Sequence, residues 1–135
     1  MKFLVGYNGS EVAKAALFLA GKYAAQFEAK IFVVTSMAGG QAENPKDIDR
    51  VTQDLEFAEK YLSENGIACE THQLVRGRPA GEDLVSYAEE NDIDQIFVGI
   101  EKKSKTQKIL LGSNAQYIIL KSPCPVVSVN HSSMQ

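Results

Sequence analysis

The chain has 135 residues, 44% of them apolar, and a net charge of −3 at pH 7. A chain of this length and balance predicts one globular domain over residues 1–135 that buries its own core. The acidic balance argues against a nucleic-acid binder, because such proteins expose a basic face. No apolar run approaches the roughly 20 residues of a membrane span, and the N-terminal run is too short for a signal peptide, so we expect a cytoplasmic protein.

Short apolar runs alternate with helical patterns along the whole chain. The expected strands are residues 2–6, 30–35, 68–75, 95–99 and 126–129. The expected helices follow Ser10, open at Pro45, run from 80 to about 91, and run from 113 or 114 to about 120. This alternation predicts the α/β class, an open parallel sheet with helices on both faces. The third strand is the least apolar and is expected at a sheet edge.

Local signals predict where these helices begin and end. Ser10 has a side chain suited to cap the first helix, and Pro45 suits the first position of the second. Gly66 suits the position just after the second helix, where a left-handed conformation is common.

The stretch from Gly99 to Ser113 joins the fourth strand to the last helix. It carries four lysines, at positions 102, 103, 105 and 108, and a single acid, Glu101. Ligands of open α/β sheets bind outside the carboxyl ends of the strands, and a helix start offers unpaired N–H groups to an anion. We therefore expect this stretch to hold the phosphates of a nucleotide. The plainer interpretation of Gly112–Ser113 is an ordinary helix start, in which Ser113 only caps.

Several pieces of the sequence, spread over nearly its whole length, resemble the universal stress protein family. Val5-Gly6-Tyr7-Asn8-Gly9-Ser10 is similar to that family's first strand end, where Asp-Gly-Ser is usual. Gly77-Arg78-Pro79 is similar to the Gly-x-Pro after its third strand, and Pro123-Cys124-Pro125-Val126 to its last strand entry. Gly99, position 102 and Gly112-Ser113 match the spacing Gly-x2-Gly-x9-Gly-Ser/Thr of the ATP-binding branch.

The resemblance implies a Rossmann-like fold of the adenine nucleotide alpha hydrolase type, with five parallel strands in the order 3-2-1-4-5. It implies a stress-response regulator that binds ATP or AMP, with or without Mg²⁺, between the first and fourth strands. It also implies a homodimer joined through the last strand and an unidentified protein partner.

The resemblance also implies two sets of binding residues. The phosphates are expected at Gly99, Lys102, Lys103, Gly112, Ser113 and Asn114. The adenine and ribose are expected at Tyr7, Asn8, Ser36 and Met37. No catalytic residue and no metal ligand is assigned; the cysteines and histidines lack the spacing of a metal site.

Two positions depart from the family pattern. Asn8 stands where Asp is usual, which keeps an oxygen that accepts hydrogen bonds but weakens a role in metal binding. Lys102 stands where the second Gly is expected. If that position needs a positive φ, the loop takes another path; otherwise the Lys102 ammonium contacts a phosphate. The sequence leaves both alternatives open.

Two other functions compete with a nucleotide-binding regulator. One is a dimeric scaffold of the same family that binds no nucleotide, which the departures at Asn8 and Lys102 favour. The other is a slow ATPase or phosphotransferase, which ranks lower because the sequence contains neither Gly-x4-Gly-Lys-Ser/Thr nor Gly-x-Gly-x-x-Gly.

Overall fold

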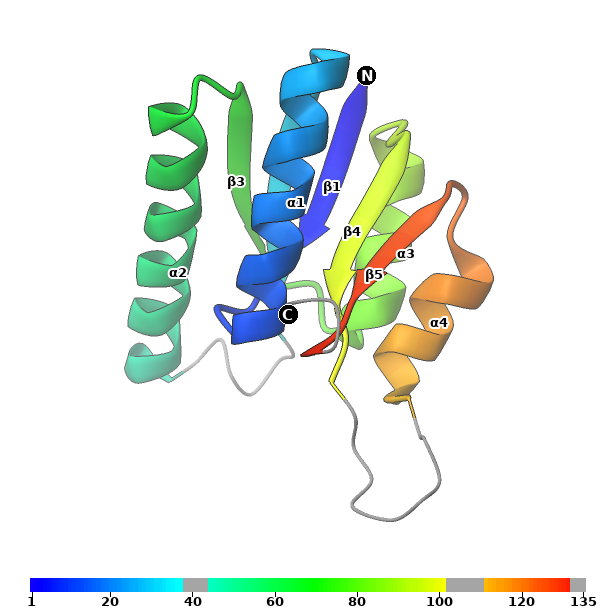
Figure 1. The fold of residues 1–135 in the computed structure, drawn as a ribbon. Coiled ribbons are helices and arrows are strands. Elements are labelled where there is room, and N and C mark those ends of the chain that lie inside the picture. Colours follow the sequence, from blue (N-terminus) through cyan, green and yellow to red (C-terminus); the bar gives the residue numbers. More distant parts are fainter. Residues whose placement is uncertain (38–43, 102–110, 132–135) are drawn as a thin grey trace.

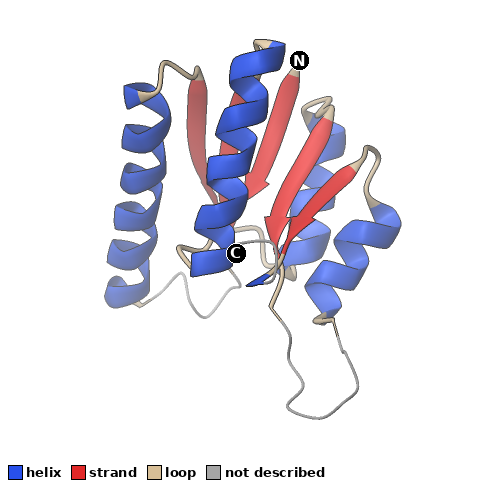
Figure 2. Ribbon diagram, in the orientation of Figure 1, coloured by secondary structure: helices blue, strands red, loops and turns tan. Residues whose placement is uncertain are grey.

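The computed structural model describes residues 1–37, 44–101 and 111–131. Within these ranges strands and helices alternate, as Figure 2 shows. In chain order they are β1 (Lys2–Gly6), α1 (Glu11–Phe27), β2 (Lys30–Ser36), α2 (Pro45–Glu64), β3 (Cys69–Leu74), α3 (Ala80–Glu90), β4 (Gln95–Gly99), α4 (Ser113–Lys121) and β5 (Val126–Val129).

The strands form one parallel sheet in the order β3-β2-β1-β4-β5. The α/β class, the strand order and the edge position of β3 are therefore confirmed. The first strand lies between β2 and β4, so the chain reverses its direction of winding between β1 and β4. Such a switch point is where open sheets leave room for a ligand.

The helices cover the two faces of the sheet in pairs (Figure 1). The α1–α2 face buries a cluster that includes Phe3, Leu17 and Phe97. The α3–α4 face buries another, which includes Leu4, Leu84 and Ile96. The middle residues of β1 and β4 are buried on both faces, as the continuous apolar runs predicted. Among the described residues, no helix combines the length and apolarity that crossing a membrane requires.

The predicted helix ends are largely confirmed, because local chemistry determines them. The Ser10 hydroxyl accepts the backbone N–H of Ala13 at 3.2 Å and caps α1. Pro45 opens α2, which ends before Gly66 with its φ of +72°. The carboxyl ends of all five strands lie at the same end of the sheet, where α1 and α4 also begin (Figure 1).

Candidate functional site

Two adjoining cavities lie at the carboxyl ends of the strands. The inner cavity, of about 200 Å³, lies between the ends of β1, β2 and β4 and the first turns of α3 and α4. The outer cavity, of about 300 Å³, lies between the starts of α1 and α4. The two share four lining residues: Asn8, Gly99, Asn114 and Ala115. Together they form a continuous site at the switch point between β1 and β4.

The start of α4 lines the outer cavity and carries no side-chain cap. Gly112, with φ −62° and ψ 155°, occupies the N-cap position, and its carbonyl accepts the N–H of Gln116 at 3.0 Å. The prediction that Ser113 caps this helix is wrong, because Ser113 is already its first residue. The first N–H groups of a helix lack intrahelical partners and attract anions. This helix start can therefore bind a phosphate group.

Two asparagines present amide hydrogens where the cavities meet. The side-chain oxygen of Asn8 accepts the backbone N–H of Ser10 at 3.0 Å. The side-chain oxygen of Asn114 accepts the backbone N–H of Gly81 at 2.9 Å and ties α4 to α3. Each oxygen already accepts one hydrogen bond from the protein, and each side chain keeps an NH₂ group, a hydrogen-bond donor, for a ligand. Both asparagines therefore add to the positive character of the α4 start.

The two hydroxyls at the end of β2 have the opposite character. Thr35 Oγ1 donates to the carbonyl of Tyr7 at 2.6 Å. Ser36 Oγ donates to Oδ2 of Asp83 at 2.7 Å. Both residues line the inner cavity, and since each hydroxyl has one hydrogen, neither keeps one for a ligand.

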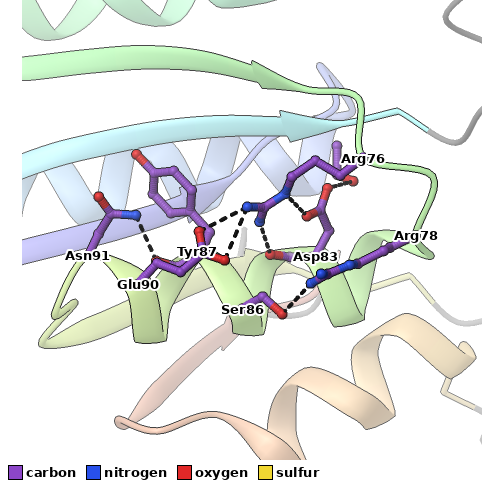
Figure 3. A network of polar contacts seen from close by, with 8 residues as sticks. Arg76, Arg78, Asp83, Ser86, Tyr87, Glu90 and Asn91 are labelled. Atoms are coloured by element: carbon purple, nitrogen blue, oxygen red, sulfur yellow. Dashed lines mark hydrogen bonds and ion pairs between the residues drawn. The ribbon is translucent and has the colours of Figure 1, made fainter.

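Asp83 is a fully buried acid on α3 and belongs to the polar network drawn in Figure 3. Its Oδ1 accepts a hydrogen bond from Nε of Arg76 at 2.5 Å, and its carbonyl accepts from Nη2 of the same guanidinium at 3.2 Å. Nη1 of Arg76 pairs with Glu90 at 2.9 Å. A buried carboxylate needs a paired charge and hydrogen bonds to be tolerated, and Arg76 with Ser36 supplies both.

Gly99 lines both cavities, and the packing of α1 explains why it is a glycine. A Cβ atom built on it would lie 2.6 Å from both Ala13 N and Val12 O, and closer still to Val12 C. The end of β4 therefore rests directly on the backbone of α1. This close approach brings the wall of the site next to the first turn of α1.

Tyr7 and Met37 send their side chains to the other side of the sheet. Both are buried in the cluster under α1 and α2, and Met37 Sδ accepts a hydrogen bond from Gln73 at 2.7 Å. Tyr7 borders the inner cavity, but its phenol packs in that cluster and has no hydrogen-bond partner among the described residues. Burial, with a smaller effect of the nearby Asp54 and Glu11 carboxylates, raises the pKa of Tyr7 to about 12.

The structure thus brings seven of the ten expected residues to the walls of the two cavities: Tyr7, Asn8, Ser36, Gly99, Gly112, Ser113 and Asn114. Lys102 and Lys103 lie outside the described residues. Thr35, Arg76 and Asp83 were not predicted as site residues. The one available signal was the charge of Asp83, which stands beside Leu84 and Val85 on the apolar side of its helix.

The described walls offer little to a metal ion. In the part of the chain that the structure describes, no group of three or more His, Cys, Asp or Glu side chains could hold one. Glu101 is the carboxylate among the described residues that line the outer cavity. Mg²⁺ sites on nucleotides use one or two carboxylates besides phosphate oxygens, so an ion here would depend mainly on the phosphates.

Comparison with known proteins matches residues 1–130 to the universal stress protein family. A universal stress protein of Thermus aquaticus is 30% identical over 132 residues, which cover 93% of this chain and 96% of that protein. The structure of a universal stress protein from Archaeoglobus fulgidus matches with a TM-score of 0.81 and 33% identity, and the match covers 95% of this chain and 96% of that chain. A universal stress protein from the same organism, solved in complex with dAMP, has a TM-score of 0.75 and 29% identity over 95% of this chain and 94% of its own. The chain therefore belongs to the universal stress protein family.

Proposed function

We propose that this chain is an adenine-nucleotide-binding regulatory module that acts in the cytoplasm as a homodimer. ATP or AMP would occupy the two adjoining cavities, with its phosphates in the outer one and its nucleoside in the inner one. The observation that carries this proposal is the order of hydrogen-bonding groups along the site. Donors gather at the α4 start, and engaged hydroxyls lie at the end of β2.

The donor end of the site suits a phosphate. It combines the uncapped first turn of α4 with the amides of Asn8 and Asn114. Peptide N–H groups at a helix start and side-chain amides bind phosphate without a metal ion. The similarity to the dAMP-bound protein of Archaeoglobus fulgidus, at 29% identity, supports an adenine nucleotide as the ligand. Mg²⁺ would enter only with a triphosphate, since Glu101 is the carboxylate that the described wall contributes.

Binding rather than rapid catalysis is the activity proposed here. The described walls of the two cavities carry amides, hydroxyls and one carboxylate. Both histidines, His72 on β3 and His131 after β5, stand on elements outside these walls. General acid–base catalysis needs a group within hydrogen-bond reach of the reacting proton. The competing slow ATPase or phosphotransferase would have to use a residue other than these histidines.

The proposed dimer would form along β5. This strand is one edge of the sheet, and an unpaired edge presents a row of N–H and C=O groups to another strand. The carbonyl of Pro125 accepts from Ile96 of β4, and that of Val129 accepts from Ile100 just after β4. By alternation, the backbone of Ser128 faces outward. The Ser128→Pro variant should sediment with the mass of a monomer instead of a dimer, and its helical content should equal that of the wild type. A dimer that survives this change uses another surface.

The test of nucleotide binding begins with the protein as purified. After denaturation, the small molecules released are identified by chromatography and mass, and fresh protein is titrated calorimetrically with AMP, and with ATP in the presence and absence of Mg²⁺. Stoichiometric release, or binding at submillimolar concentration, is expected. No adenine nucleotide released and no binding at millimolar concentration would contradict the proposal and favour the scaffold function.

A further inference from the structure

The Ser36 hydroxyl faces the inner cavity with its hydrogen already engaged. Ser36 is half-buried and lines the cavity, whereas its acceptor, Asp83, is fully buried. The hydrogen of Ser36 Oγ points at Oδ2 of Asp83, 2.7 Å away. A hydroxyl has one hydrogen and two lone pairs. What Ser36 Oγ can offer a ligand is therefore a lone pair.

Arg76 determines which group is the donor in the hydrogen bond between Ser36 and Asp83. Its Nε donates to Oδ1 of Asp83 at 2.5 Å, so the acid is paired as a carboxylate, which only accepts hydrogen bonds. Its Nη1 is engaged by Glu90 at 2.9 Å. The second oxygen of Asp83 is thus left to Ser36, and Ser36 has to be the donor.

The hydroxyl of the neighbouring Thr35 also has no hydrogen left to donate to a ligand. Thr35 Oγ1 has its hydrogen engaged by the Tyr7 carbonyl at 2.6 Å. The amides of Asn8 and Asn114 lie where the two cavities meet. The side chains that donate hydrogen bonds therefore lie on the phosphate side of the site, and the hydroxyl oxygens at the end of β2 are acceptors.

We propose that Ser36, oriented by Asp83 and Arg76, makes the site prefer a purine with an amino group at position 6 over one with a carbonyl there. The inference rests on the proposed nucleotide site and adds the side chain that distinguishes the base. A 6-amino group donates a hydrogen to the lone pair of Ser36 Oγ. A 6-oxo group places a lone pair against that lone pair and leaves both acceptors unpaired. The second arrangement weakens binding on the order of tenfold.

The experiment compares AMP with IMP, which differ at position 6 and in the hydrogen that N1 of IMP carries, by calorimetric titration of the whole protein. The wild-type protein should bind AMP about tenfold more tightly than IMP, since one unpaired polar group is at stake. Ser36→Ala should bring the ratio of the two affinities close to one. Ser86→Ala is the matched control. Ser86 lies on the same helix as Asp83, but its hydroxyl accepts a hydrogen bond from Arg78 at 2.8 Å. The ratio of AMP to IMP affinity in Ser86→Ala should therefore equal that of the wild type.

A second variant reverses the direction of the hydrogen bond. In Asp83→Asn the amide oxygen can still accept from Arg76 Nε, while the amide NH₂ donates to Ser36 Oγ. The Ser36 hydrogen is then turned toward the cavity, where it suits a carbonyl. The affinity ratio should shift in favour of IMP relative to the wild type. A purely structural role of Asp83 would weaken AMP and IMP equally and leave the ratio unchanged.

The possible outcomes separate this inference from the proposed function. No AMP binding by the wild-type protein overturns both. Equal wild-type affinities for AMP and IMP, or an unchanged preference in Ser36→Ala, overturn the role of Ser36 and leave the nucleotide site standing. Circular dichroism checks that each variant folds, and if Asp83→Asn does not, Ser36→Ala decides the question alone.

Discussion

Replacing Gly99 by alanine tests the contact on which the site is built. The added Cβ would lie 2.6 Å from Ala13 N and Val12 O, whereas carbon atoms pack at about 3.5–4.0 Å. The end of β4 and the first turn of α1 would have to separate by about 1 Å. Backbone atoms cannot escape by changing rotamer, so we expect a loss near the upper end of overpacking costs, about 3 kcal/mol of unfolding free energy. For a chain of this size that corresponds to a fall of about 10 °C in Tm.

Gly21→Ala is the matched control, since it makes the same chemical change inside α1. Its Cβ would meet Leu62 Cδ2 and Tyr61 Cε2 at 3.6 Å, an ordinary contact distance. Alanine in place of glycine inside a helix should raise the unfolding free energy by about 0.5–1 kcal/mol. Thermal and urea unfolding followed by circular dichroism measure both effects. A Gly99→Ala variant as stable as wild type, or a Gly21→Ala variant equally destabilised, would refute the reasoning.

Three further predictions concern the site and its surroundings. Gly112→Val should weaken AMP binding at least tenfold without lowering Tm, because φ −62° and ψ 155° suit any residue; unchanged calorimetric affinity would place the phosphate elsewhere. Asn114→Ala should lower the unfolding free energy by about 1 kcal/mol in urea, through the lost hydrogen bond to Gly81; a neutral result would contradict that role. Burial raises the pKa of Tyr7 to about 12, so its contribution to stability is present below pH ~10 and is lost as the pH rises toward the folded pKa. Tyr7→Phe should flatten the fall of the unfolding free energy above pH ~10, and equal pH dependence in both proteins would refute this.

Features set by neighbouring residues were predictable from the sequence. Ser10 caps α1 through the N–H of a residue three positions on, and Pro45 and Gly66 bound α2. These signals act within one turn of a helix, so they survive in any fold that keeps the helix. The strand order came from the resemblance to a family rather than from periodicity, because apolar runs alone do not say which strands are neighbours.

Features set by distant residues were harder to predict. Ser36 and Met37 were assigned together to the base, yet successive residues of a strand point to opposite faces. Ser36 meets Asp83, while Met37 packs under α1 and α2. The pairing of Arg76 with Asp83 depends on the turn at Gly77, with its φ of +68°, which leads the chain from β3 into α3. Nothing in the composition of either segment identifies Ser36 as the residue that joins Arg76 and Asp83 in one hydrogen-bonded group.

The most direct test of the account is to locate a bound nucleotide along the chain. Titration of ¹⁵N-labelled protein with AMP should shift the backbone amide signals of Ser113 and Asn114, which are expected at the phosphate, and of Ser36, which is expected at the base. The signal of Leu62, a core residue on the buried side of α2, should stay unchanged. Shifts confined to α2 and β3, or none at millimolar AMP, would contradict the central claim that the strand ends between β1 and β4 form the nucleotide site.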